Sequence, residues 1–367
     1  MGNDAVDPFQ YLGSYGVGTG MTFGINKLYE SSLVQTNAVN PEITWEVANV
    51  YNIGFESFLF NNKLQFNAEA FYQRRNNILV KRNASVPDFS GISLPDENFG
   101  IVDSKGFEIV LGYTDKAGDF SYSINGNLAF ARNKIIDYDE PARNVPWQIR
   151  TGHSQGALLL YNSIGVFKDD AAVAAYPHVA GARPGDLIIE DYNKDGQITS
   201  DDQILFDKTS TPRITYGFSF SFSYKNLELS GLVQGVGATW EKMPYVNMGT
   251  DANYFKYYAD GRWTQDNITA DKPRIFNRTD EYWRSDYLTS YDYNNRAFAR
   301  MKNLQLSYTF PQNIAKAIWL KNAKVYVSGQ NLFLLYNAFV WKADPEIGEL
   351  YSYPLMRVYA AGIQIEF

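Results

Sequence analysis

The sequence predicts an all-β protein whose strands, about nine of them and antiparallel, form part of a large transmembrane β-barrel. Three observations support this fold class. Aromatic residues are abundant in a polar background, apolar and polar residues alternate through strand-length segments, and short connections alternate with long ones.

The composition combines many aromatic rings with small polar residues. The 367 residues include 27 Tyr, 24 Phe and 7 Trp, which favours strands over helices. There is no cysteine, so disulfide and thiolate chemistry are excluded for this chain. The net charge of -7 argues against nucleic-acid binding, and no apolar run reaches the roughly 18 residues of a membrane-spanning helix.

The alternation is clearest in ITYGFSFSFSY, residues 214–224, where an apolar residue occupies every even position and a small or polar residue every odd one. In a membrane barrel the rings would face lipid, and Ser219, Ser221 and Ser223 would line the lumen. In a soluble sandwich the same rings would pack against a second sheet. The number of such segments favours the barrel. Strands are expected at about 51–60, 64–73, 104–113, 119–131, 213–224, 227–236, 297–310, 323–332 and 356–367.

The connections between these strands alternate in length. Outer-membrane barrels have short periplasmic turns and long extracellular loops, so the alternation sets the orientation. The expected extracellular loops are residues 74–103, 132–212, 237–296 and 333–355. Residues 1–49 are expected to be irregular and to belong to a further extracellular loop, with residues 50–367 as a C-terminal barrel region that lacks a plug domain.

The last expected strand has an aromatic end. Tyr359, Ala361, Ile363 and Ile365 would share one face, and Phe367 is the final residue. This pattern resembles the signal that barrel-assembly machinery recognises, which makes Phe367 the expected assembly residue.

Several blocks resemble one family of transporters. They are NPEITWEVANVYNIGFE at 40–56, AFYQRRNNIL at 70–79, NFGIVDSKGFEIVLGY at 98–113, PGDLIIEDYNKDGQITSDDQIL at 184–205, RMKNLQLSYTFP at 300–311 and VYVSGQNLFLLY at 325–336. Their order and spacing resemble the SusC/RagA class of TonB-dependent outer-membrane transporters.

The resemblance implies the C-terminal part of a plugged barrel of about 22 strands. Such a protein would lie in the outer membrane of a Gram-negative bacterium, among its lipids. It would import oligosaccharides or peptides together with a SusD-like lipoprotein, and would be energised by TonB through an N-terminal region that this chain does not include.

One loop matches the spacing of a calcium-binding loop. Asp191, Asn193, Asp195 and Asp202 offer side-chain oxygens, and Gln197 offers its backbone carbonyl, in the pattern D-x-N-x-D-G with an acid at the twelfth position. An ordinary Asp/Asn/Gly-rich surface turn remains the alternative. Calcium is thus the one cofactor considered, and no organic cofactor is expected.

Aromatic residues in the long loops form a second candidate site, because Tyr and Trp rings can stack on sugar faces. Loop packing and the aromatic girdle of the membrane interface are the alternative. The candidate substrate-binding residues are Tyr254, Tyr257, Trp263, Tyr282, Trp283 and Tyr291.

Catalysis is not expected. His153 and His178 are the only histidines, and no G-x-S-x-G, P-loop or zinc spacing is present. The sequence therefore predicts a transport protein without enzymatic activity. A soluble or surface β-rich module that binds glycans or mediates adhesion is the alternative function.

Overall fold

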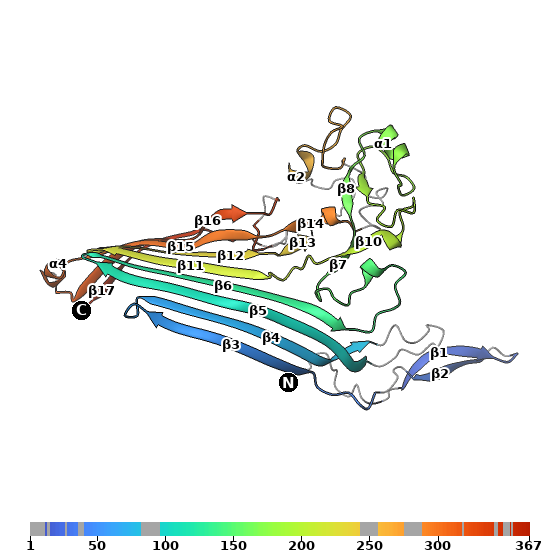
Figure 1. The fold of residues 1–367 in the computed structure, drawn as a ribbon, viewed down its shortest axis with the longest axis horizontal. Coiled ribbons are helices and arrows are strands. Elements are labelled where there is room, and N and C mark those ends of the chain that lie inside the picture. Colours follow the sequence, from blue (N-terminus) through green and yellow to red (C-terminus); the bar gives the residue numbers. More distant parts are fainter. Residues whose placement is uncertain are drawn as a thin grey trace. The chain divides into compact units, whose positions relative to one another are not determined.

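A computed structural model describes residues 12, 15–25, 28–35, 40–81, 96–242, 256–274, 288–317, 319–340, 344–347, 353 and 355–367. A nine-stranded sheet dominates it, in the order β17-β16-β15-β12-β11-β6-β5-β4-β3 (Figure 1). Its strands are β3 (Val47–Leu59), β4 (Leu64–Lys81), β5 (Asp96–Ala117), β6 (Phe120–Asp137), β11 (Ile214–Tyr224), β12 (Leu227–Gly237), β15 (Phe298–Thr309), β16 (Asn322–Asn337) and β17 (Val358–Glu366).

The sheet confirms the nine predicted strands and the alternation of their connections. Residues 60–63, 118–119, 225–226 and 310–321 form the short connections, the last of which contains α4 (Gln312–Ala317). The connections 82–95, 138–213, 238–297 and 338–357 are longer. Strands that follow one another in sequence are neighbours throughout the sheet, as in an up-and-down barrel.

The strand register gathers the apolar residues on one face. Residues directly opposite each other in neighbouring strands share a face of the sheet. Phe222 of β11 lies opposite Tyr122 of β6 on one side and Leu229 of β12 on the other. The row continues through β15, β16 and β17 with Leu306, Val327 and Ala361. We call this surface the apolar face.

The other face of the same strands is polar. Ser221 lies opposite Ser123 and Ser230, and the next two strands continue this row with Gln305 and Ser328. We call this surface the polar face. One row nearer the short connections, Glu228 of β12 pairs with Lys324 of β16 at 3.2 Å. Such a surface suits a hydrated lumen, whereas uninterrupted aliphatic and aromatic side chains suit lipid.

Two glycines of β12 make room for rings on the apolar face. A Cβ atom at Gly231 would collide with the ring of Phe220, and one at Gly235 would collide with Tyr216. Tyr216 uses this space to donate a hydrogen bond from its hydroxyl to the carbonyl oxygen of Phe298, at 3.0 Å. These rings therefore lie flat along the sheet.

Two regions expected to be irregular contain regular strands. Within residues 1–49, β1 (Tyr15–Phe23) and β2 (Leu28–Gln35) pair as an antiparallel hairpin, so the expectation of an irregular segment was wrong there. The Gly-rich composition hid the pattern, because a glycine has no side chain to mark a face. The expected loop at 74–103 is also shorter, since β4 continues to Lys81 and β5 begins at Asp96.

The connection 138–213 has structure of its own. It contains β7 (Leu158–Tyr161), β8 (Ser163–Val166), α1 (Asp170–Ala175), β9 (Leu187–Ile189) and β10 (Gln203–Phe206), with β7 paired to β10 and β8 to β9. The connection 238–297 adds β13 (Trp240–Lys242), α2 (Lys256–Ala259) and β14 (Tyr293–Asn295), with β13 paired to β14. Across the described parts of the chain, no helix has the length and apolar character that crossing a membrane requires.

The chain divides into two compact units. One comprises Met1–Asn52, Phe71–Lys105 and Arg132–Gln155, and the other comprises Ile53–Ala70, Gly106–Ala131 and Gly156–Phe367. The first holds the outer parts of β4, β5 and β6 with the segment that follows them. The second holds the short connections and the remaining loops.

Candidate functional site

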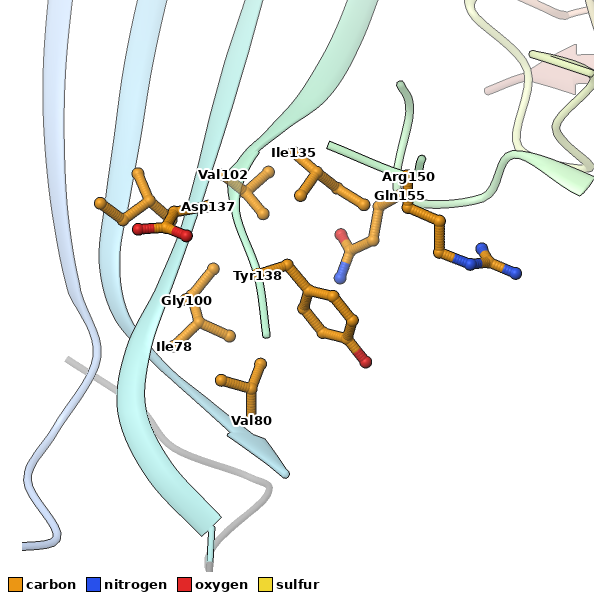
Figure 2. A pocket seen from close by; sticks show the side chains of 10 residues that line it. Ile78, Val80, Gly100, Val102, Ile135, Asp137, Tyr138, Arg150 and Gln155 are labelled. Carbon is orange, nitrogen blue, oxygen red and sulfur yellow. The ribbon is translucent and has the colours of Figure 1, made fainter. Parts of the chain in front are cut away.

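A cavity of about 380 Å³ lies in the first unit, where β4, β5 and β6 approach the long connections. Ile78, Val80 and Gly100 lie on one side of the space, and Tyr138 and Gln155 on the other (Figure 2). Most of the lining is aliphatic, and polar groups come from a few positions. The full lining is Ile78, Val80, Gly100, Ile101, Val102, Ile135, Asp137, Tyr138, Arg150 and Gln155.

A local irregularity in β4 brings the aliphatic residues to the cavity. Asn77 has a positive φ of 58°, which interrupts the two-residue alternation of the strand. Beyond it, Ile78 and Val80 point toward Gly100 of β5, where an added Cβ would lie 3.2 Å from both side chains. Asn98 holds the irregularity in place by donating from Nδ2 to the carbonyl oxygen of Asn77, at 2.8 Å.

The segment after β6 forms the opposite wall. It turns back along the strand, with Ile135 N–H donating to the His153 carbonyl and Gly152 N–H donating to the Ile135 carbonyl, both at 2.8 Å. Glu140 fixes this turn because its carboxylate accepts hydrogen bonds from the N–H groups of Arg150 and Thr151 and from the Thr151 hydroxyl. Burial acts to raise the pKa of Glu140, but these hydrogen bonds outweigh it and leave the pKa below its usual value.

The cavity suits a ligand that has both an aliphatic part and charged or hydrogen-bonding groups. Ile78, Val80 and Ile135 supply apolar contact, while Asp137 and Arg150 supply opposite charges at the lining. This site was not predicted from the sequence. Its residues come from three strands and from the segment after β6, and both the irregularity at Asn77 and the turn held by Glu140 bring them together.

The predicted calcium loop has a closed hydrogen-bonded conformation. The Asp191 carboxylate accepts from the N–H groups of Asp195, at 3.2 Å, and Gly196, at 2.9 Å. Asn193 Oδ1 accepts from Asp195 N–H at 2.9 Å, and Asp195 Oδ1 accepts from Gln197 N–H at 2.8 Å. Gly196 has a φ of 84°, the left-handed conformation that the sharp turn requires. Asp191, Asn193 and Asp195 thus converge on one side of the turn.

The side chain of Asp202 holds the predicted calcium loop in its closed conformation. It is fully buried, and its carboxylate accepts from the N–H groups of Tyr192, Asn193 and Thr199 at 2.9, 3.3 and 2.7 Å. Three such bonds leave little room for bidentate metal contact. Within the described residues no group of three or more His, Cys, Asp and Glu side chains is placed to hold a metal ion. A cation here would depend on Asn193 and the Gln197 carbonyl as well as on the carboxylates.

Only some of the candidate substrate-binding aromatic residues lie in the part of the chain that the structure describes. Trp263 and Tyr291 pack against Val166 and Leu187, the buried centre of the loop region, and the Trp263 indole donates to the Lys168 carbonyl at 3.0 Å. These two rings therefore hold loops together. Tyr254, Tyr282 and Trp283 lie outside the described residues, as does the side chain of Tyr257 in α2.

Charged groups also join the loops of the second unit. Arg274 Nε donates to the buried carboxylate of Asp186 at 2.8 Å. On β15, Arg300 pairs with Asp344 at 2.6 Å and with Glu346 at 2.7 Å, while Lys302 pairs with Glu346 at 2.6 Å. These contacts tie residues 344–346 to the sheet.

The C-terminal residue lies beyond the last strand. Phe367 is exposed and follows β17, where Ile363 and Ile365 lie opposite Val325 and Ala323. The strand is at the edge of the sheet, as a terminal barrel strand would be. The role of Phe367 in barrel assembly stays a prediction.

Comparison with known proteins supports the barrel. No family model matches the sequence. The whole chain aligns with the TonB-dependent receptors P26 and P3 of Formosa agariphila, at 27% and 25% identity, and covers 39% and 38% of their lengths. It also aligns over 98% of its length with the TonB-dependent receptor SusC of Bacteroides thetaiotaomicron, at 19% identity, covering 36% of that protein.

The fold matches solved structures of the same kind. The RagAB peptide importer in its open-open state aligns with a TM-score of 0.72 and 23% identity, covering 99% of this chain and 38% of the solved one. The RagAB peptide transporter aligns with a TM-score of 0.70 and 22% identity, covering 100% and 40%. The sheet is therefore part of a β-barrel of the bacterial outer membrane. Over nearly its whole length the chain is similar to TonB-dependent receptors, SusC among them, and it spans about two fifths of their length.

Proposed function

We propose that the chain forms part of an importer that takes up nutrients across the outer membrane, energised by TonB and assisted by a SusD-like lipoprotein. The observation that best supports this proposal is that the sheet has two different faces. Its polar face suits a water-filled lumen, and its apolar face suits lipid. This arrangement speaks against a soluble glycan-binding module, which would need a second sheet over the apolar face. The relatives named above are receptors and transporters, and we propose no catalytic activity.

Within this function, we propose that the cavity at the outer parts of β4, β5 and β6 receives an aliphatic side chain of a peptide substrate. Its aliphatic lining and its opposite charges at Asp137 and Arg150 match a peptide better than a neutral sugar, which stacks on aromatic rings. Tyr138 is the one aromatic residue of the lining. RagAB, which shares the fold, was solved as a peptide importer.

The test uses the full receptor with its lipoprotein partner. Val102→Phe should fill the cavity, whereas Ile136→Phe places the same ring at a position outside the lining. Peptide uptake and binding should fall at least tenfold for Val102→Phe and stay close to the parent for Ile136→Phe. Equal peptide uptake by both variants would refute the assignment of the cavity, and uptake of oligosaccharides alone would refute the peptide substrate.

We also propose that the loop from Asp191 to Asp202 binds calcium weakly. Asp191, Asn193, Asp195 and the Gln197 carbonyl would be the ligands, with Asp202 either bracing the loop or completing the site. The support is the convergence of the first three side chains around the turn at Gly196. Millimolar calcium should slow amide exchange across residues 191–202 in the parent protein and not in Asp195→Ala. If calcium has no effect on the parent, the loop is an ordinary turn.

A further inference from the structure

Residues 344–347, in the connection between β16 and β17, are attached to the polar face of the sheet and are here called the strap. The strand register identifies the face. Arg300 of β15 lies opposite Gln234 of β12, and Gln234 lies opposite Gly217 of β11, an odd-numbered position like the serines of the polar face. Arg300 is buried and reaches Asp344 at 2.6 Å. The strap therefore lies on the polar side of the sheet.

The backbone of the strap is held as firmly as its side chains. Arg296, which precedes β15, donates from Nε to the carbonyl oxygen of Pro345 at 3.0 Å and from Nη2 to that of Glu346 at 3.1 Å. The remaining nitrogen of this guanidinium binds the carboxylate of Glu241 in β13. Pro345 is fully buried. The strap is thus packed against its surroundings instead of extending into solvent.

A β-bulge supplies a further cation. Between Met301 and Asn303 the register of β15 against β12 shifts, so that Lys302 is an extra residue of β15. A bulge changes the direction of a side chain relative to regular alternation. The Lys302 amine binds Glu346 at 2.6 Å, and Arg300 reaches the same carboxylate at 2.7 Å. The irregular part of the strand is therefore the part to which the strap is attached.

The charges of this attachment balance. Three cations meet three carboxylates, all within the second compact unit. They are Arg296, Arg300 and Lys302 on one side and Glu241, Asp344 and Glu346 on the other. Moving the strap away would leave buried charges without their partners, which is strongly unfavourable. The network therefore gives the strap a fixed position.

This position is level with the beginning of β15. Arg300 is the third residue of that strand, and the long connection 238–297 leads into it. In an outer-membrane barrel the ends of the strands that lead to the long connections are extracellular. A molecule that moves inward along the polar face of β15 passes the strap first.

We propose that the strap limits the size of the molecules that enter the lumen along β12, β15 and β16. Arg300 determines this size limit because it fixes Asp344 and Glu346 against the wall. The inference goes beyond the proposed function and rests on it in one respect, namely that the polar face lines the path of the imported molecule. It holds for a peptide and for an oligosaccharide alike.

The first test measures access to the lumen in intact cells that produce the full receptor with its lipoprotein partner. Ser230→Cys, in an otherwise cysteine-free receptor, places a thiol on the polar face four residues from Gln234, toward the short connections. Asp344→Asn with Glu346→Gln releases the strap. A small maleimide should react equally with and without release, whereas a maleimide that carries a long polyethylene glycol chain should react at least fivefold faster after release.

The matched control removes two carboxylates that pair with lysines near the short connections. Asp115 pairs with Lys63 at 2.8 Å, and Asp119 pairs with Lys225 at 4.0 Å. Asp115→Asn with Asp119→Asn should leave both reaction rates unchanged. Equal rates of the large reagent in all three proteins would overturn the proposal. Equal acceleration in both double variants would do so too, as would a thiol at position 230 that even the small reagent does not reach.

Uptake provides a second measurement that separates this inference from the proposed function. Cells are given a short peptide, either alone or joined to a bulky dye. Release of the strap should raise uptake of the dye-labelled peptide at least fivefold relative to the unlabelled one. A parallel fall in both would show that the strap only supports the fold, and would overturn the proposal. If the parent takes up neither form, the peptide substrate is refuted, and the maleimide rates still decide whether the strap limits access.

Discussion

Arg300 donates two hydrogen bonds of 2.6 Å from one terminal nitrogen to the two carboxylate oxygens of Asp344. The guanidinium is almost completely buried on β15, and Asp344 lies in the connection that leads to β17. This contact joins the connection that leads to β17 to the sheet.

Replacing Arg300 by Met should loosen residues 344–347. The change leaves the carboxylates of Asp344 and Glu346 without their main counter-charge, and breaking a buried ion pair from one side costs about 3–5 kcal/mol. Amide exchange of this segment should accelerate in the variant. Lys256→Met is the control, because the Lys256–Asp260 pair is exposed, with 76% and 56% of the two side chains accessible. Equal effects of both variants would show that the Arg300 network does not anchor the loop.

Asp202→Asn should destabilise the loop that begins at Asp191. The buried carboxylate accepts three backbone N–H groups, and an amide offers one oxygen in place of two. A buried donor left unsatisfied costs about 1–3 kcal/mol. Amide exchange of Tyr192, Asn193 and Thr199 should rise at least fivefold, while the exposed control Asp266→Asn should leave it unchanged. Protection of these amides in Asp202→Asn would contradict this account.

Asp292 should make the loop around it sensitive to pH. Burial raises the pKa of its carboxyl to about 7, and its Oδ1 atom has no hydrogen-bond partner among the described residues. The folded loop therefore holds a proton that the unfolded chain releases near pH 4. From about pH 4 to about pH 7 the free energy of local unfolding should fall as pH rises, and above that window it should level off.

Amide exchange over residues 288–297, corrected for the intrinsic pH dependence, measures this slope. Asp292→Asn should remove it, because the amide does not titrate. A slope that persists in Asp292→Asn would assign the pH dependence to another group.

The sheet could be predicted from sequence because each of its strands alternates between two different environments. Ile214 to Tyr224 shows this directly, and its observed bounds differ from the expected ones by one residue. The parts of β4 and β5 farthest from their short connections could not be found in this way, because polar residues such as Arg74 and Arg75 follow one another there and no longer alternate with apolar ones. The hairpin in residues 15–35 was missed because glycines leave no pattern.

The candidate sites were harder to predict for a related reason. Asp191, Asn193 and Asp195 are close in sequence, so their spacing was visible. The cavity joins Ile78, Gly100 and Ile135 from three strands, and the pairing of Arg300 with Asp344 spans 44 residues. Contacts of this kind depend on register and loop conformation, which local patterns do not encode.

The central claim is that the apolar face meets lipid and the polar face meets the lumen. Adjacent residues of β11 test it, because Phe218 lies on the apolar face and Ser219 on the polar face. The chain has no cysteine of its own, so Phe218→Cys and Ser219→Cys can each carry one fluorescent label in an otherwise cysteine-free receptor. Brominated lipids should quench the label at residue 218 and leave the label at 219 bright, while aqueous iodide should do the reverse. Equal quenching at both positions, or quenching by lipid at 219 alone, would contradict the account.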